Sequence, residues 1–216
     1  MKSLAKNFLK DEDKKKVEAA VAEAEKKTSG EIVIMIVPSS YGYPMAEVTG
    51  AAAFALPVSI LLTIYIGGLF WIGTRDMWLF MGVFAVSFFV LRFLLKRLPF
   101  AKRWFVSKRE VEEEVQEAAV TSFYQKGLFR TRDETGVLLF ISVFERKVWV
   151  LADRGINEKV PKDAWNRVVE VATSGIREKR AAEAICTAVE TIGGMLAAKF
   201  PIKPDDTNEL KNLIIE

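Results

Sequence analysis

The chain has 216 residues, a formal net charge of +3 and no histidine. Without histidine, Ser–His–Asp and Cys–His catalysis, a His-ligated zinc site and an imidazole general base are excluded. The near balance of 31 basic and 28 acidic side chains provides no basic surface for nucleic acid, so we expect no nucleic-acid partner.

The first predicted elements are a helix and a strand. Residues 11–29 have apolar side chains at helical spacing, with acids near the start and lysines near the end. Residues 31–37 form a continuous Ile, Val and Met run that ends at Pro38, which is typical of a strand buried on both faces. Ser39 and Ser40 follow in a loop rich in turn residues.

Two long apolar runs then interrupt the soluble sequence. Residues 48–74 carry no charged side chain, and residues 77–95 carry only Arg92. About 20 apolar residues in a helix cross the hydrocarbon core of a bilayer, so each run is long enough. Only Arg75 and Asp76 separate the runs. The sequence therefore predicts a two-helix transmembrane hairpin whose flanks lie on the same side of the membrane.

Basic residues gather after the second run, against a single arginine between the runs. Because basic residues near membrane spans favour the cytoplasmic side, both termini are predicted to be cytoplasmic. The same side chains suit contact with anionic lipid, which makes the lipid bilayer an expected partner. This membrane-interface basic cluster consists of Arg92, Lys96, Arg97, Lys102, Arg103, Lys108 and Arg109.

The second soluble segment begins with a helix and two strands. Ser107 and Glu110 have the spacing of a capping box, which predicts a helix that starts there. The β-rich runs at 136–144 and 147–152 predict an antiparallel hairpin. The order strand, helix, strand predicts a parallel pair between 31–37 and 136–144, and thus an α/β fold with a mixed sheet.

Two more helices complete the predicted domain. One begins near Pro161, and the longer covers residues 179–200 and contains Cys186, the only cysteine. A lone cysteine forms no intrachain disulfide, and within an apolar helical pattern it is expected in the core. The predicted division is 1–47 and 96–202 as two parts of one domain, 48–95 as the hairpin, and 203–216 as a polar tail.

Candidate binding residues lie where two predicted strands end. Ligands of open α/β sheets bind at the carboxyl ends of the strands. Those positions hold Ser39 and Ser40 after the first strand, and Glu145 and Arg146 after the second. Ordinary turn chemistry accounts for the same residues, and the sequence leaves both readings open.

A second candidate site contains three carboxylates. Asp133 and Glu134 precede the strand at 136–144, and Asp153 follows the strand at 147–152, so all three belong to the opposite end of the sheet. Carboxylate oxygens suit a hard cation such as Ca²⁺ or Mg²⁺. The alternative is that the three are solvated loop residues, and no catalytic residue is assigned.

Three segments resemble the TPM-domain family: 8–37, 123–169 and, for its membrane-embedded bacterial branch, 201–210. The resemblance implies an α/β/α sandwich around a small mixed sheet, into which this chain inserts its transmembrane hairpin. Members of the family have been described as acid phosphatases, as calcium-binding proteins, and as assembly or accessory factors. Phe129 stands where relatives often have histidine, and Arg154 where they often have an acid, and both weaken a hydrolase or metal-site interpretation.

The prediction is therefore a multi-pass protein of the bacterial inner membrane with a cytoplasmic TPM-like domain. Its expected role is a binding, assembly or quality-control accessory module, with another membrane protein or complex as its partner. The alternative is a metal-assisted acid phosphatase that uses Asp133, Glu134 and Asp153. A third reading makes the hairpin a simple anchor.

Overall fold

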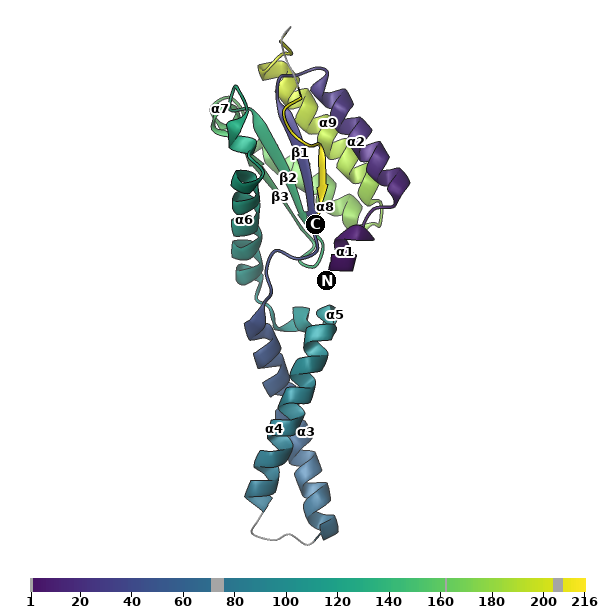
Figure 1. The fold of residues 1–216 in the computed structure, drawn as a ribbon, viewed down its shortest axis with the longest axis vertical. Helices are drawn as coiled ribbons and strands as arrows, with labels where there is room; N and C mark the ends of the chain where they lie inside the picture. The colour runs from purple at the N-terminus through teal and green to yellow at the C-terminus, as the bar shows by residue number, and fades with distance from the viewer. Residues whose placement is uncertain (1, 71–75, 162, 204–207) are drawn as a thin grey trace. The chain divides into compact units, whose positions relative to one another are not determined.

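The computed structural model describes residues 2–70, 76–161, 163–203 and 208–216 (Figure 1). The fold is mixed α/β, with a four-stranded sheet in the order β3-β2-β1-β4. The chain divides into two compact units, one of residues 1–41 with 112–216 and one of residues 42–111. The second unit thus interrupts the sequence of the first.

The sheet is built around β1 (Glu31–Val37), whose seven residues are all buried. β2 (Gly136–Ser142) runs parallel to β1, with Leu139 opposite Ile34. β3 (Lys147–Ala152) pairs antiparallel with β2. The predicted parallel crossover and the predicted hairpin are both confirmed, although β2 ends at Ser142 and not at residue 144.

Helices cover both faces of this sheet (Figure 1). α6 (Lys108–Gln125) lies on one face, and α2 (Asp11–Glu25), α8 (Ala164–Arg177) and α9 (Ala181–Lys199) lie on the other. The α/β/α sandwich with a mixed sheet is confirmed. The backbone N–H of Glu110 donates to Ser107 Oγ at 3.1 Å, so α6 begins with the predicted cap. The remaining short elements of the first unit are α1 (Lys2–Lys6), η3 (Leu128–Arg130) and α7 (Arg154–Asn157).

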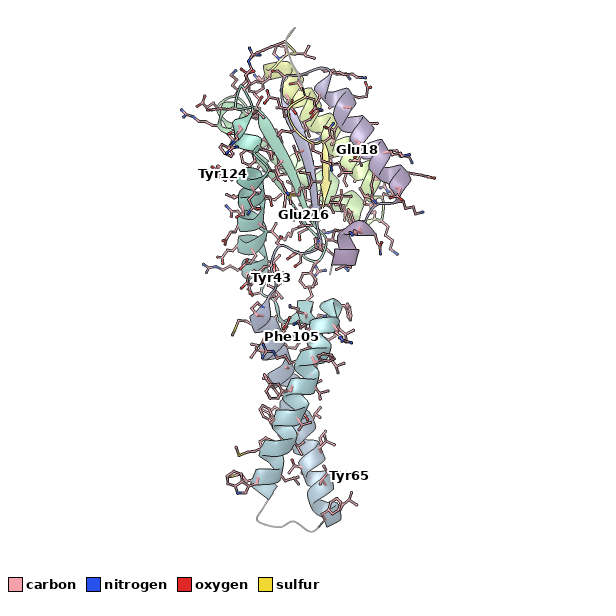
Figure 2. All side chains as sticks on the ribbon, viewed as in Figure 1. Glu18, Tyr43, Tyr65, Phe105, Tyr124 and Glu216 are labelled. Carbon is pink, nitrogen blue, oxygen red and sulfur yellow. The ribbon has the colours of Figure 1, made fainter. Side chains whose placement is uncertain are left out.

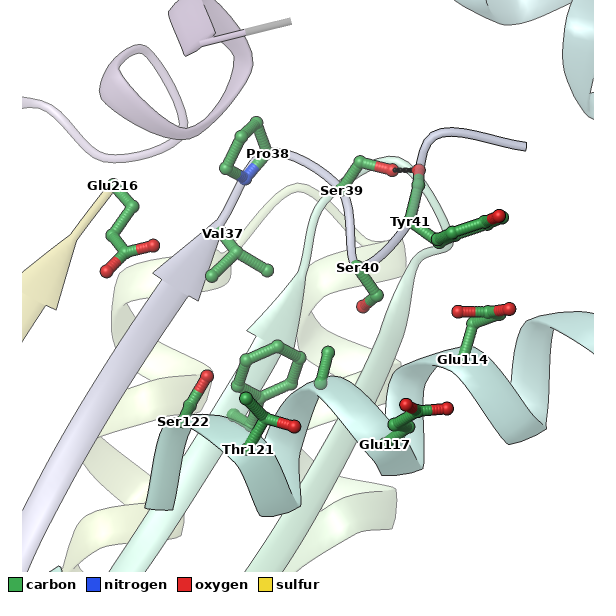
Figure 3. Close-up of a pocket in the computed structure, with 12 residues that line it drawn as sticks. Val37, Pro38, Ser39, Ser40, Tyr41, Glu114, Glu117, Thr121, Ser122 and Glu216 are labelled. Carbon is green, nitrogen blue, oxygen red and sulfur yellow. Dashed lines mark hydrogen bonds between the residues drawn. The ribbon is translucent and has the colours of Figure 1, made fainter. Parts of the chain in front are cut away.

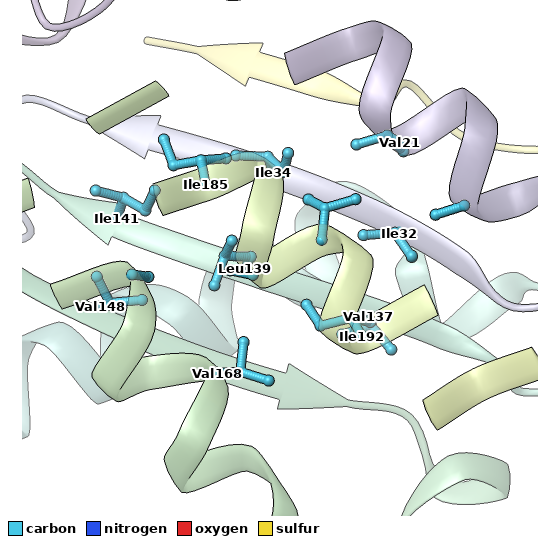
Figure 4. Packing of buried hydrophobic residues seen from close by; sticks show 14 of the residues in the cluster. Val21, Ile32, Ile34, Val137, Leu139, Ile141, Val148, Val168, Ile185 and Ile192 are labelled. Carbon is cyan, nitrogen blue, oxygen red and sulfur yellow. The ribbon is translucent and has the colours of Figure 1, made fainter. Parts of the chain in front are cut away.

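The core of the first unit lies between the sheet and the layer of α2, α8 and α9 (Figure 4). Ile34 and Leu139 from the sheet meet Val168 and Ile185 from the helices, and all four are fully buried. Cys186 packs partly buried against this core, next to Ile185 on α9. Every buried residue of the cluster comes from 1–41 or 112–216.

The end of the chain forms a strand that the sequence did not predict. β4 (Leu213–Ile215) pairs parallel with β1, within the segment described above as a polar tail. Hydrogen bonds to Glu25 fix the residues that precede β4. Glu25 Oε2 accepts from the side-chain amides of Asn208 at 3.1 Å and Asn212 at 3.2 Å. A three-residue strand is too short to give a periodic pattern, and its register depends on these distant contacts.

The second unit contains α3 (Pro44–Phe70) and α4 (Asp76–Arg97), which pack against each other, followed by α5 (Pro99–Lys102) and η2 (Arg103–Phe105). Among the described residues, three helices are long and apolar enough to cross a membrane, namely α3, α4 and α9. The core position of α9 accounts for its apolar composition. The predicted turn at Arg75 lies outside the described residues, and Asp76 begins α4.

The burial pattern of α3 is the reverse of that of a soluble core helix. Its buried positions carry small side chains, and these include Ala51, Ala55, Ser59 and Thr63, spaced four residues apart. Its large apolar side chains are exposed, as Tyr65 is in Figure 2. Small residues at this spacing let two helices approach closely, and α3 packs against α4.

Candidate functional site

Three of the four predicted binding residues meet at the carboxyl edge of the sheet. Glu145 Oε1 accepts from Ser39 Oγ at 3.1 Å and from the backbone N–H of Ser40 at 3.0 Å. Glu145 Oε2 accepts from Ser142 Oγ at the end of β2. The ends of the two parallel strands are therefore tied together by one carboxylate, as the topology predicts.

The carboxylate of Glu145 has a structural role in this site. Glu145 is only 4% exposed, and both of its oxygens accept hydrogen bonds. It holds the loop after β1 against the turn between β2 and β3. Arg146 does not join the group, because it occupies the left-handed region at φ 53° in that tight turn. Arg146 is therefore an ordinary turn residue, whereas Glu145 positions the loop that contains Ser39 and Ser40, here called the serine loop.

The serine loop borders an open cleft of about 560 Å³ (Figure 3). One side is the segment that leaves β1, and the other is the facing surface of α6. Phe140, fully buried on β2, lies at its floor. The lining residues are Val37, Pro38, Ser39, Ser40, Tyr41, Glu114, Glu117, Ala118, Thr121, Ser122, Phe140 and Glu216.

Five of the twelve residues that line the cleft belong to α6, a helix whose sequence carries no binding motif. Glu114, Glu117 and Thr121 recur at a spacing of three and four residues and so share one face of the helix. That spacing was visible in the sequence. It carried no functional meaning until the crossover placed this face beside the carboxyl end of β1.

Hydroxyl groups and carboxylates line this cleft together with apolar side chains. Ser40 Oγ is buried and has no hydrogen-bond partner among the residues that the structure describes. Tyr41 is exposed, and Ser39 Oγ donates to its carbonyl at 2.7 Å. Glu216 pairs with Lys126, the residue that follows α6, at 2.8 Å between Nζ and Oε1. The cleft is therefore suited to a ligand with both polar and apolar parts.

The three predicted metal ligands lie at the opposite edge of the sheet. Asp133 pairs with Lys203 at 2.6 Å, and Asp153 Oδ1 accepts from the backbone N–H of Arg154 at 2.7 Å as the N-cap of α7. Asp153 N donates to the carbonyl of Gly136 at 2.8 Å, so Asp153 lies beside the start of β2. Glu134 adopts a left-handed backbone conformation in the turn before that strand.

These carboxylates have separate roles rather than a common centre. Within the described ranges, no group of three or more His, Cys, Asp or Glu side chains is placed to hold a metal ion. Asp153 Oδ2 is buried and has no hydrogen-bond partner in the described part of the chain. Binding of Ca²⁺ or Mg²⁺ here stays a prediction.

One member of the basic cluster turns inward. Lys102 is only 2% exposed, donates to the carbonyl of Gly42, and pairs with Glu47 at 2.7 Å. It therefore joins the start of α3 to α5 and does not face lipid headgroups. Arg92, Lys96, Arg97, Arg103, Lys108 and Arg109 are exposed, and their contact with lipid headgroups stays a prediction.

The comparisons with known proteins bear on both units. The model of the TPM domain family matches residues 4–56 and 103–195. The unmatched stretch between them falls within α3, α4 and α5. No curated protein matches the chain. The BA42 protein of the psychrophilic bacterium Bizionia argentinensis, known from an NMR structure, is 20% identical, with a TM-score of 0.59 over 96% of this chain and 94% of that one. At that identity the likeness supports the fold alone.

Proposed function

Because this chain belongs to the TPM domain family, we propose that it is a TPM module anchored in a membrane, where it binds another membrane protein. The observation that carries this proposal is the inverted burial of α3, which packs small residues inward and exposes large apolar ones. In water such exposure is unfavourable, whereas in lipid the apolar surface is solvated and close packing of small residues holds helices together.

The same contrast separates α3 and α4 from α9. On α9 the large apolar residues Ile185, Ile192 and Leu196 are fully buried, so its apolar face is already covered by the domain. On α4, Phe89 and Phe93 are more than half exposed. An anchor made of α3 and α4 leaves α9 in the soluble domain and gives a protein that crosses the bilayer twice.

The basic cluster supports a cytoplasmic domain at the bacterial inner membrane. Lys96 and Arg97 lie at the end of α4 that leads back to the TPM domain, and both are exposed. Basic residues at this position favour the cytoplasmic side. Replacing Cys186 with Ala and placing single cysteines at Lys10 and Met77, both exposed, tests this orientation. Only Met77→Cys should react with an impermeant maleimide in intact spheroplasts.

A binding role is supported by the cleft beside β1. Glu145 accepts two hydrogen bonds from the serine loop and one from Ser142 at the end of β2, so the loop is held in place before any partner arrives. A pre-formed cleft at the carboxyl edge of a sheet is the usual position for a ligand in this class of fold. The partner is expected in the same membrane, because β1 and α6 are the two elements that lead directly into the anchor.

Site-specific photo-crosslinking in native membranes tests the binding role. A benzophenone amino acid at Thr121 lies on the cleft surface of α6, and a matched probe at Thr187 lies on an exposed position of α9. We expect one discrete adduct with an integral membrane protein from Thr121 and none from Thr187. Identical patterns from the two positions, or no adduct from Thr121, would contradict a binding role for the cleft.

The acid phosphatase remains the second candidate, on the strength of the orphaned Asp153 Oδ2 beside the loop that carries Asp133 and Glu134. Its test is hydrolysis of a phosphate monoester by the purified protein with Ca²⁺ or Mg²⁺, compared with a D133N/E134Q/D153N variant. A metal-dependent activity that the triple variant loses supports the enzyme. Equal rates in both proteins would remove these carboxylates from any catalytic role.

A further inference from the structure

The short segment formed by α5 and η2, directly after α4, has two unlike faces. Lys102 is buried, and the ring of Phe105 meets the ring of Phe54 on α3 edge to face, at 5.7 Å between centroids. Phe100 and Trp104, by contrast, are 75% and 73% exposed. Resting on the membrane anchor proposed above, we propose that α5 and η2 lie in the headgroup region of the bilayer, with both exposed aromatic side chains inserted among the lipids.

The inner face of this segment is fixed to the beginning of α3. Lys102 donates to the carbonyl of Gly42 and pairs with Glu47 at 2.7 Å. The ring of Phe105 lies close to Gly50, where an added Cβ would be 2.9 Å from Phe105 Cδ2. All of these residues belong to the second unit, and Figure 1 shows α5 at the end of α4. α5 and η2 are therefore held beside α3 by one face, and the other face stays turned outward.

The outer face carries the two aromatic side chains next to each other. The rings of Phe100 and Trp104 are 6.0 Å apart between centroids and meet at 60°. Of the large apolar side chains that the structure describes, these two are the most exposed. In water such exposure is unfavourable. Tryptophan is enriched where a membrane meets water, because its ring is apolar while its indole N–H finds a polar acceptor.

The aromatic pair continues the apolar surface of α4. Phe93, Leu94 and Leu98 are exposed and lead toward α5. Lys96 and Arg97 are exposed between them, and the guanidinium group of Arg97 lies 4.4 Å from the centre of the Phe93 ring. Exposed aromatic and basic side chains together at the end of an apolar helix are typical of the level where lipid tails give way to headgroups. This sequence of surfaces matches lipid from the core of a bilayer outward, so lipid is the expected occupant.

A segment at this level sets how deep the helix pair lies in the bilayer. An apolar helix adapts to bilayer thickness by tilting or by local changes of the lipid, at a modest cost. An inward shift would carry Lys96 and Arg97 into hydrocarbon, and an outward shift would leave Phe100 and Trp104 in water. Both shifts are opposed, so α5 and η2 hold α3 and α4 at one depth.

The test measures the depth of single fluorophores in the full-length protein in nanodiscs. In a Cys186→Ala background, an NBD fluorophore is attached to Phe100→Cys, Trp104→Cys or Val86→Cys. Val86 is 66% exposed near the middle of α4 and reports on the anchor itself. The nanodiscs contain lipid with a nitroxide quencher either on the headgroup or deep on the acyl chain.

We expect the headgroup nitroxide to quench both α5–η2 labels more strongly than the acyl-chain nitroxide does, and the opposite order at Val86→Cys. Adding Trp104→Ser to the Phe100→Cys protein should remove most of the headgroup quenching. The matched variant is Trp78→Ser, which removes a tryptophan that is 71% exposed near the start of α4 and should leave this quenching unchanged. Equal effects of the two serine variants would overturn the role of the aromatic pair.

The label at Val86 separates this inference from the proposed function. If Val86→Cys is quenched by the acyl-chain nitroxide while neither α5–η2 label is quenched, the anchor stands. The outer face then meets water or a protein, and the inference is wrong. Quenching of the α5–η2 labels in the same order as Val86→Cys would place the segment in the hydrocarbon core and overturn it as well. Absence of quenching at Val86→Cys would remove the anchor and the inference together.

Discussion

Glu145 shows how one residue determines the geometry of the candidate site. Its buried carboxylate receives hydrogen bonds from the side chains of Ser39 and Ser142 and from the backbone of Ser40. Each buried donor left without an acceptor costs about 1–3 kcal/mol. We expect Glu145→Ala to lower the free energy of unfolding by about 3 kcal/mol, a value at the upper end for a single group.

Chemical denaturation of the detergent-solubilised protein, followed by tryptophan fluorescence, measures this effect. Glu112→Ala is the matched control, because Glu112 pairs with Lys147 at 2.9 Å on the exposed surface. Exposed pairs contribute at most about 1 kcal/mol. Equal losses in the two variants would mean that Glu145 does not hold the serine loop.

The pair between Lys102 and Glu47 is the corresponding single-residue feature of the second unit. Both side chains are largely buried, with Nζ and Oε1 2.7 Å apart. Removing one partner of a buried pair leaves an uncompensated charge at a cost of about 3–5 kcal/mol. We therefore expect Lys102→Met to be strongly destabilising.

The double variant E47Q/K102M distinguishes this effect from a simple loss of packing. With both charges gone, most of the lost stability should return, as it does when buried pairs are replaced by uncharged residues. Unfolding in mixed micelles provides the measurement. A double variant as unstable as Lys102→Met alone would show that the lysine stem, and not the charge pair, holds α5 to the start of α3.

At the level of elements, burial decides which predictions succeed. β1 was predicted with its observed ends, because Pro38 and a run of fully buried residues define it. β4 was not predicted, because the position of this strand depends on a residue far away in sequence. That residue is Glu25, which accepts hydrogen bonds from Asn208 and Asn212. Local pattern specifies a long buried strand, while a short edge strand is specified by its tertiary contacts.

In the candidate site, too, some residues were predicted from the sequence and others were not. Sequence topology correctly brought Ser39, Ser40 and Glu145 to one edge, because parallel strands place their carboxyl ends together. It missed Glu114 and Glu117, because an acidic, exposed helix face looks the same whether it borders a cleft or open solvent. Which face of a crossover helix turns toward a strand end depends on packing that the sequence pattern does not contain.

The helix pair of the second unit gives a prediction of its own. Ala55 on α3 is fully buried where α3 and α4 pack, whereas Ala53 is exposed. Ala55→Leu overfills this contact and should cost about 1–3 kcal/mol. Ala53→Leu introduces the same side chain toward the surroundings and should be nearly neutral.

The resistance of the helix pair to unfolding by SDS, with the protein in nanodiscs as the starting state, provides the comparison. Ala55→Leu should unfold at a lower SDS fraction than the wild type, and Ala53→Leu should not. The reverse order would mean that α3 contacts α4 through its other face, and that the small residues around Ala55 do not form the helix contact.

At the scale of the whole molecule, the two units bury different kinds of side chain. The core of the first unit draws every buried residue of its cluster from 1–41 and 112–216, and none from the inserted helices. The second unit buries small residues and exposes large apolar ones. A domain whose core is complete without an insertion does not depend on that insertion to bury its apolar side chains, which fits the anchoring role proposed for the inserted helices.

This separation predicts that the TPM domain folds as a soluble protein after the helices are excised. Joining Tyr41 to Ser107 through a Gly/Ser linker keeps the cap of α6 and the whole core cluster. Linker length should matter little, because each doubling adds only about 0.6 kcal/mol to the cost of closing the loop. The excised chain should appear in the soluble fraction and unfold cooperatively on heating, and Ile34→Asp, at a fully buried site, should abolish this unfolding transition. Aggregation at every linker length would instead make the helices part of the folding unit, and the anchor would then be structural as well as positional.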